Sequence, residues 1–323
     1  MEDAAMELYS SRKNLVQVSK LYYMAGMSQE EIAHTMGISR SKVSRMLTLA
    51  REMKVVQFNV CEYPDLRAEL EHKLSAHFGL KTVRVVPSAS TIAESKHNVG
   101  KAAAALLRSR LRDHMRIGLE WGSTCDALVE SYTENPPVQD VEIIQITGGM
   151  HISDAIMDGR EQVKHLAHKI GCGCQLLQYP MMVHNSELAR MILENECPDY
   201  FARMSGLDLA FVGLGSSLPE ESSTYLGGYI TLEQARQLVE QGFAADVCGH
   251  RLTQDGQPAQ TMLEGKLITL SLEQLHRLPC VVGIAAGDHK KESIIAASKG
   301  GYISGLVCDE VAAIAVAGSE HLI

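Results

Sequence analysis

The sequence of 323 residues predicts an α/β protein in which a small helical head precedes a doubly wound parallel-sheet domain. From residue 81 onward, short apolar runs alternate with helical segments of roughly 10 to 25 residues, which is typical of parallel strands covered on both faces. Before residue 61 the periodicity is helical, with one β-rich run at its end. We therefore expect a winged helix-turn-helix domain over 1–60, a connector helix over 61–80, and a parallel-sheet domain over 81–323.

The composition indicates a globular protein with an uneven distribution of charge. Hydrophobic residues make up 46% and charged residues 21% of the chain. The net charge is −9, yet residues 10–55 hold eight Lys or Arg against three acids. A basic head on an acidic body favours local contact with a phosphate backbone. Eight cysteines without a secretory segment predict reduced thiols in the cytoplasm, and no apolar run reaches the roughly 20 residues that a membrane-spanning helix needs.

The head contains the start and stop signals of short helices. After a first helical segment that ends near Gly26, Ser28 and Glu31 form a capping-box pattern, and Gly37 suits a left-handed helix exit. Ser39 can then cap a further helix. Two short helices joined by the tight turn "GIS" predict a helix-turn-helix, and the β-rich run "KVVQFNV" at 54–60 predicts a wing behind it.

The second helix of such a motif enters the major groove with its first turns foremost. The polar positions just after the cap would then face bases and phosphates, since Arg and Lys pair with guanine and Ser suits phosphate oxygens. The simpler alternative is a basic face that is only solvated, the common meaning of a charge run. The predicted DNA contacts are Arg40, Ser41, Lys42, Ser44 and Arg45.

The connector segment carries Leu66, Leu70 and Leu74 at four-residue spacing, with charges between them. This stripe predicts a helix that packs on its own domain or, as the second interpretation, forms a dimer seam.

Seven apolar runs of the large domain predict its strands. In doubly wound sheets, ligands lie beyond the carboxyl ends of the strands, near the point where the strand order reverses. The predicted strands are "KTVRVVP" (81–87), "MRIGLEW" (115–121), "VEIIQITGG" (141–149), "CQLLQYPMMV" (174–183), "LDLAFVGLG" (207–215), "CVVGIAAGD" (280–288) and "YISGLVCDE" (302–310).

Four loops after these strands carry groups suited to a small anion. "WGSTCDAL" offers Gly122 for close backbone approach, two hydroxyls and the first amides of a helix. "TGGM" and "VGLGSS" add glycines, and "AAGDHKKES" brings Lys290. A single such loop is usually only a turn. Four at one edge, without a Walker lysine motif or a dinucleotide fingerprint, favour a small phosphorylated ligand.

Together the two halves resemble the SorC/DeoR-type family of bacterial sugar-responsive transcriptional regulators over nearly the whole chain. The motifs that carry the resemblance are "MSQEEIAHTMGISRSKVSRML" (27–47), "WGST" (121–124), "TGG" (147–149), "VGLG" (212–215), "GGYI" (227–230), "ADVCG" (245–249) and "KGGYISGLVCDE" (299–310).

Family membership implies a winged helix-turn-helix joined to an effector domain that resembles sugar-phosphate isomerases and deaminases, generally in a tetramer. It implies operator DNA and a phosphorylated sugar or polyol as partners, with Asp246 binding ligand hydroxyls. One departure is that Ala286 and Gly287 stand where many relatives have two glycines. The expected effector-binding residues are Trp121, Gly122, Ser123, Thr124, Gly148, Gly149, Gly215, Asp246 and Lys290.

Two alternatives are a metal site and an enzymatic function. A metal site at His165, His168, Cys172 and Cys174 is disfavoured, because a helix face and alternating strand positions converge poorly. A sugar-phosphate isomerase or deaminase is the rival function, but no candidate base is placed beside a second catalytic group. We expect no catalytic residues, metal or cofactor, and a regulator of a carbohydrate or polyol utilisation operon.

Overall fold

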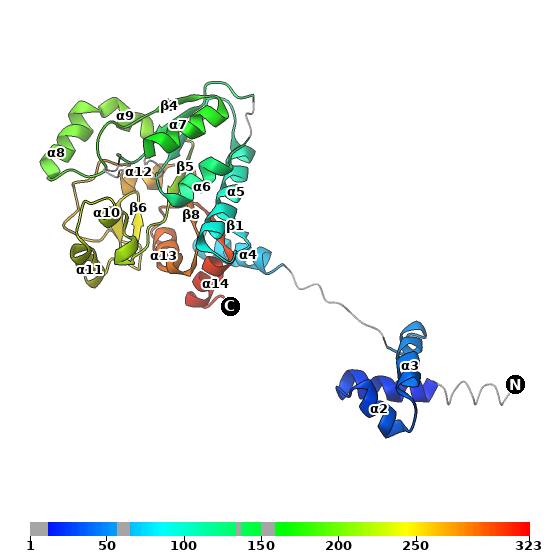
Figure 1. Cartoon of the computed structure of the whole chain (residues 1–323). Helices are drawn as coiled ribbons and strands as arrows, with labels where there is room; N and C mark the ends of the chain where they lie inside the picture. The colour runs from blue at the N-terminus through cyan, green and yellow to red at the C-terminus, as the bar shows by residue number, and fades with distance from the viewer. Residues whose placement is uncertain (1–11, 57–64, 134–136, 150–158) are drawn as a thin grey trace. The chain divides into compact units, whose positions relative to one another are not determined.

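The computed structural model describes residues 12–56, 65–133, 137–149 and 159–323 (Figure 1). The chain divides into two compact units, Met1–Tyr63 and Pro64–Ile323. The helix expected to connect them is part of the second unit.

The first unit contains a helix over the described residues 12–19, which continues as the π-helical turn η1 (Lys20–Met24), followed by α2 (Gln29–Met36) and α3 (Arg40–Glu52). Ser28 forms the predicted capping box with Glu31, Gly37 ends α2 with a φ of 64°, and the Ser39 side chain caps α3. The apolar stripes meet in a small core of Val18, Ile32, Val43 and Leu47. Of the expected wing, only residues 54–56 are described, without strand structure, and 57–60 lie outside the described residues.

Seven parallel strands form the sheet of the second unit, in the order β1-β9-β8-β5-β2-β3-β4. This confirms the predicted doubly wound α/β fold. Each predicted run contains strand residues. In the run 174–183, the strand covers only the start. The strands are β1 (Thr82–Val86), β2 (Arg116–Leu119), β3 (Glu142–Gln145), β4 (Gly173–Gln175), β5 (Leu209–Gly213), β8 (Val281–Ala285) and β9 (Gly305–Asp309).

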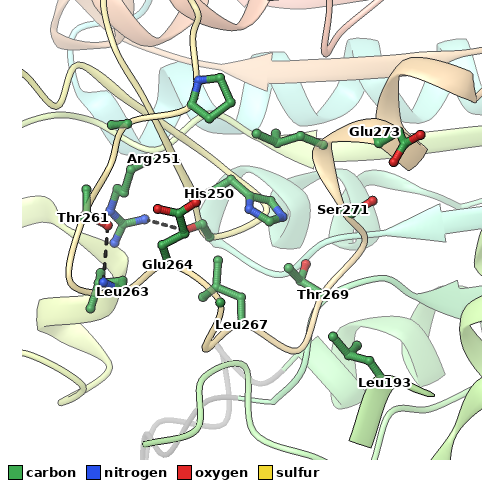
Figure 2. A pocket seen from close by; sticks show the side chains of 15 residues that line it. Leu193, His250, Arg251, Thr261, Leu263, Glu264, Leu267, Thr269, Ser271 and Glu273 are labelled. Carbon is green, nitrogen blue, oxygen red and sulfur yellow. Dashed lines mark hydrogen bonds between the residues drawn. The ribbon is translucent and has the colours of Figure 1, made fainter. Parts of the chain in front are cut away.

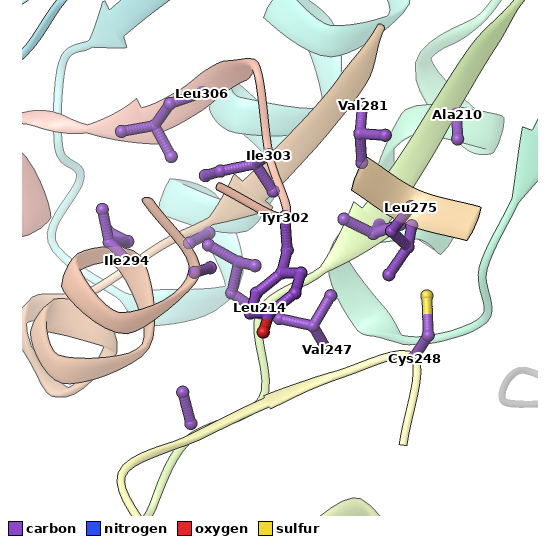
Figure 3. Close-up of a cluster of buried hydrophobic side chains, with 14 of the residues drawn as sticks. Ala210, Leu214, Val247, Cys248, Leu275, Val281, Ile294, Tyr302, Ile303 and Leu306 are labelled. Atoms are coloured by element: carbon purple, nitrogen blue, oxygen red, sulfur yellow. The ribbon is translucent and has the colours of Figure 1, made fainter. Parts of the chain in front are cut away.

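Helices cover both faces of the sheet because the buried strands are apolar on both sides (Figure 1). One face packs on α5 (Ile92–Arg110), α6 (Ser123–Ser131) and α7 (Gly159–Ile170). The other packs on α4 (Leu66–Phe78), α12 (Leu272–Arg277), α13 (Lys291–Lys299) and α14 (Glu310–Ser319). Figure 3 shows part of this second core, where Leu214, Val247 and Ile294 surround Tyr302.

The predicted connector helix α4 packs against β1 and α14 of its own unit. Leu70 and Leu74 are fully buried in the core there, whereas Leu66 is 43% exposed. The leucine stripe is therefore an intradomain packing surface at its two buried positions.

A further group of short elements belongs to this unit. The antiparallel hairpin of β6 and β7, two strands of three residues each, was not predicted. Its turn uses Cys248 and Gly249, both with positive φ. The elements are α8 (Ser186–Met191), η3 (Ile192–Glu196), α9 (Pro198–Met204), η4 (Pro219–Glu221), α10 (Ser223–Leu226), α11 (Leu232–Glu240), β6 (Ala245–Val247), β7 (His250–Leu252) and η5 (Asp288–Lys290).

The strand order reverses between β2 and β5. From β2 the chain proceeds outward through β3 and β4, then returns to β5 on the other side of β2 and proceeds through β8 to β9. A crevice at this position is the usual ligand site of such sheets. Within the described ranges, no helix is long and apolar enough to cross a membrane.

Candidate functional site

A cavity of about 250 Å³ lies at the carboxyl ends of β2, β5 and β8, at the point where the strand order reverses. Seven of the nine predicted effector-binding residues line it. The lining residues are Lys96, Glu120, Trp121, Gly122, Ser123, Thr124, Gly213, Leu214, Gly215, Glu221, Ser223, Leu226, Asp246, His289 and Lys290.

The stretch after β2 supplies one wall and the start of a helix. Gly122 has a φ of 132°, a conformation that side chains rarely adopt, and it precedes the first turn of α6 without a side-chain cap. Ser123 is exposed, and the Thr124 hydroxyl donates to the Ile284 carbonyl oxygen at 3.4 Å. The uncapped amides of a helix N-terminus favour an anion.

Lys290 brings a cation to the same cavity from η5. Burial, opposed by the carboxylates of Glu221 and Asp246 and aided by the charge of Lys96, lowers the pKa of its ammonium to about 8. At neutral pH the ammonium is still mostly protonated. A cation and a helix N-terminus in one cavity are suited to a phosphate group.

Asp246 is the centre of a buried polar cluster. Its carboxylate pairs with the Arg251 guanidinium, and it accepts hydrogen bonds from the Ser223 hydroxyl at 3.0 Å and the Gly249 amide at 2.8 Å. Arg251 also donates to the Thr224 hydroxyl oxygen at 2.6 Å. Burial with a cationic partner fixes the position of the Asp246 carboxylate at the cavity wall.

Glu120 is a second buried carboxyl group of the cavity and was not predicted from the sequence. Its Oε2 accepts a hydrogen bond from the Gly213 amide at 2.8 Å. Burial, and secondarily the charge of Asp246, raises the pKa of Glu120 well above its usual value. The available signal was a single acid at the end of the apolar run "MRIGLE". Lys96, Glu221 and Ser223 were also missed, because they come from elements distant in sequence.

The glycines of the strand-end loops serve different purposes. A Cβ on Gly215 would lie 2.6 Å from the Cβ of Asp246, so this glycine permits the β5 loop to pair with β6. Gly148 and Gly149 do not line the cavity. Their amides donate to the Ile268 and Tyr179 carbonyl oxygens, each at 2.9 Å, and are therefore occupied by the fold.

A larger cavity of about 390 Å³ is lined in part by Gly249, His250 and Arg251 of the hairpin (Figure 2). Figure 2 shows His250, Thr261, Leu263 and Leu267 in its wall, together with the Arg251 side chain that pairs with Asp246. Burial lowers the pKa of His250. Of the predicted site residues, none lines this cavity, so the smaller one carries the candidate site.

The five predicted DNA contacts of α3 are all exposed. Arg40 forms an ion pair with Glu30 of α2 at 2.8 Å, and the Arg45 Nε donates to the Ser41 carbonyl oxygen at 3.4 Å. The first turn of α3 contains no acid. The exposed side of the helix therefore presents cations and hydroxyls.

The histidines of α7 form no metal cluster. His165 Nδ1 lies 3.2 Å from a carboxylate oxygen of Glu130 on α6, in a surface contact. Across the part of the chain that the structure describes, no three His, Cys, Asp or Glu side chains are grouped so that they could hold a metal ion.

A small unit with a basic exposed helix and a sheet unit with an anion-suited cavity define a ligand-responsive regulator. Comparison with known families agrees: the model described as "Putative sugar-binding domain" matches residues 64–317, and a model described as "ECF sigma factor" matches residues 1–60. The chain belongs to this sugar-binding domain family and is a transcriptional regulator of the SorC/DeoR type, as the sequence motifs predict.

Curated relatives align over almost the whole chain. The transcriptional regulator LsrR of Enterobacter sp. (strain 638) is 28% identical over 305 residues, covering 94% of this chain and 92% of that protein. LsrR of Escherichia coli (strain K12) is 26% identical over 307 residues, covering 94% of each chain.

Solved structures show the same fold. The full-length sorbitol operon regulator SorC from Klebsiella pneumoniae has a TM-score of 0.71 and 25% identity, covering 94% of this chain and 98% of that one. A DeoR family transcriptional regulator from Listeria monocytogenes has a TM-score of 0.71 and 28% identity, covering 78% of this chain and 100% of that one.

Proposed function

We propose that the chain binds operator DNA through α3 and that a phosphorylated sugar or polyol, bound in the switch-point cavity, controls this binding. The observation that carries the proposal is that Lys290, the N-terminus of α6 and Asp246 line one cavity. The first two suit a phosphate and the third suits hydroxyls. The regulated genes would be a carbohydrate or polyol utilisation operon, read in the cytoplasm.

The phosphate-binding half consists of Lys290, the Ser123 and Thr124 hydroxyls, and the first amides of α6. A phosphate dianion there gains charge-assisted hydrogen bonds from the ammonium and from the helix N-terminus. The cavity of about 250 Å³ is of a size for a small metabolite and not for a nucleotide cofactor. We assign no phosphate contact to Gly148 or Gly149, whose amides already donate within the fold.

The hydroxyl-binding half is centred on Asp246. Arg251 and the Gly249 amide hold its carboxylate at the wall, which leaves an oriented acceptor for ligand hydroxyls. Trp121 and Gly215 shape the adjoining wall. The same arrangement argues against turnover, because an acid committed to an ion pair is a poor general base. A binding domain without catalytic residues or cofactor is therefore favoured over a sugar-phosphate isomerase.

DNA binding is proposed for Arg40, Ser41, Lys42, Ser44 and Arg45, all on the exposed side of α3. In a homo-oligomer, proposed to be a tetramer, two such helices at half-site spacing would read an operator. An effector that favours one arrangement needs a coupling free energy of about 1 to 3 kcal/mol to change operator affinity 5- to 150-fold.

A gel-shift titration tests the proposal. The full-length protein is titrated against DNA from upstream of its own gene, with and without glucose 6-phosphate, fructose 6-phosphate, ribose 5-phosphate and sorbitol 6-phosphate. We expect a sequence-specific shift that at least one phosphorylated compound changes and its unphosphorylated form does not. Absence of any specific shift refutes the regulator, and conversion of a panel member by the protein refutes the non-enzymatic role.

Variants make the test specific to the cavity. Lys290→Ala should abolish the effect of the compound while leaving DNA binding intact. The matched control is Lys291→Ala, which removes the next lysine in the chain, a side chain paired with Glu292 at 3.1 Å. Equal responses of the two variants would contradict the assignment of Lys290.

A further inference from the structure

Two buried carboxyl groups line the switch-point cavity, and their surroundings differ. Asp246 has a cationic partner in Arg251 and accepts hydrogen bonds from Ser223 and Gly249. Glu120 is only 6% exposed and pairs with no Lys, Arg or His among the described residues. Its Oε2 accepts a hydrogen bond from the Gly213 amide at 2.8 Å, and the amide and thiol of Cys248 donate further hydrogen bonds to the carboxyl group. These donors are neutral, so they do not compensate for burying a full negative charge without a cation.

The groups around Glu120 do not supply the missing charge. Asp246 repels a second negative charge, and the neighbouring thiols of Cys125 and Cys248 are buried, with pKa values raised well above the usual range. Lys96 and Lys290 line the same cavity without forming an ion pair with Glu120. Ionising Glu120 as well would place a second negative charge in the cavity beside Asp246, which already has the cation.

We propose that Glu120 is held in the cavity as a neutral carboxylic acid and donates a hydrogen bond to a ligand oxygen, beside an ionised Asp246 that accepts hydrogen bonds from ligand hydroxyls. The ligand contact rests on the proposed function, whereas the protonation state of Glu120 does not.

The consequence is selectivity for the pattern of ligand oxygens. The cavity offers a donor from Glu120 and an acceptor from Asp246 at the sheet edge, so it fits a sugar whose carbonyl, ring or hydroxyl oxygen lies next to a free hydroxyl group. A buried donor left without an acceptor is costly, which penalises analogues that lack the oxygen. Burial raises the pKa of Glu120, in agreement with this state.

The first test needs no ligand. Urea unfolding of the wild type and of Glu120→Gln is followed through the fluorescence of Trp121, the only tryptophan of the chain, which reports on the unit that contains the cavity. A carboxyl whose pKa is raised in the folded state loses stability as the pH rises above its unfolded value of about 4.3. Gln keeps the shape and has no proton to lose.

We therefore expect the urea midpoint of Glu120→Gln to increase relative to wild type as the pH is raised from 5 to 8. If the urea midpoint of Glu120→Gln relative to that of wild type stays constant or decreases over this range, the neutral state of Glu120 is refuted. The carboxyl would then be ionised in the folded protein or would titrate as it does in the unfolded chain.

The second test measures the donated hydrogen bond. Fructose 6-phosphate and glucose 6-phosphate are titrated into the wild type, Glu120→Gln and Glu120→Ala, with inorganic phosphate as the control probe. Gln retains a neutral donor and should bind within about threefold of wild type, whereas Ala should lose about tenfold. Inorganic phosphate should bind all three alike, because its contacts are at Lys290.

Equal losses in Glu120→Gln and Glu120→Ala would overturn the donor role, since both variants would then lack the required carboxylate. Failure of both sugar phosphates to bind the wild type would refute these two ligands, and failure of all four compounds of the gel-shift panel to bind would refute the function proposed for the cavity. The pH dependence of unfolding would still decide the state of Glu120, so the two failures are distinguishable.

Discussion

Raising the pH from 7 to 9 is expected to weaken the binding of a phosphorylated ligand about tenfold, because the Lys290 ammonium must be charged to hold it. The pKa of Lys290 is lowered to about 8 by burial. The ammonium is then roughly 90% charged at pH 7 and roughly 10% at pH 9. The phosphate, with a second pKa of about 6, stays doubly charged throughout. The affinity for the phosphorylated ligand is thus near its maximum at pH 7 and decreases as the pH rises through 8.

The assay is a titration of fructose 6-phosphate monitored by Trp121 fluorescence at pH 6.5, 7, 8 and 9. Lys290→Arg should bind with little pH dependence, because guanidinium stays charged over this range. Lys290→Ala should bind about 10- to 100-fold more weakly than wild type at neutral pH and weakly at every pH, because a charge-assisted hydrogen bond is lost. Lys291→Ala should follow the wild type. A wild-type affinity that is constant from pH 7 to 9, or a pH dependence that persists in Lys290→Ala, would refute the reasoning.

Three further outcomes are expected. Arg45→Ala should weaken operator binding in gel shifts and reduce the slope of log affinity against log salt by about 1, and an unchanged slope would contradict a phosphate contact. Gly215→Ala should abolish ligand binding, because its Cβ would lie 2.6 Å from the facing aspartate side chain, while Gly318→Ala, with open space around it, should bind as wild type does. Leu74→Ala should lower the free energy of unfolding by about 2 to 5 kcal/mol in urea titrations, and the exposed Leu66→Ala much less.

The sheet was predictable because its strands are buried on both faces. Such strands read as continuous apolar runs, and each of the seven runs contributed one. The run at 174–183 becomes a strand only at its start, since Pro180 and Met182 pair outside the main sheet. The β6–β7 hairpin was missed because strands of three residues carry no periodicity that a sequence pattern can detect.

The cavity was predictable where it is built from strand-end loops and not where it depends on tertiary burial. Gly122 and Lys290 follow strands directly, and parallel strands end at one edge. Glu120 has no local signal, because its Gly213 partner is far along the chain. Arg251 pairs with the nearby Asp246, but across the β6–β7 hairpin that the sequence did not reveal. The paired glycines at 148 and 149 resembled a ligand loop, but close packing also selects glycine: a Cβ at 148 would lie 2.6 Å from the Pro180 backbone.

The burial of Leu70 and Leu74 determines where the chain can be divided. A protein begun at residue 81 would lack two core leucines, each of which stabilises the fold by about 2 to 5 kcal/mol. One begun at residue 64 retains them, and both the second compact unit and the sugar-binding family match start there. Helix α4 is thus a structural part of the ligand-binding unit. A different DNA-reading head could be joined at residue 63 without opening the core.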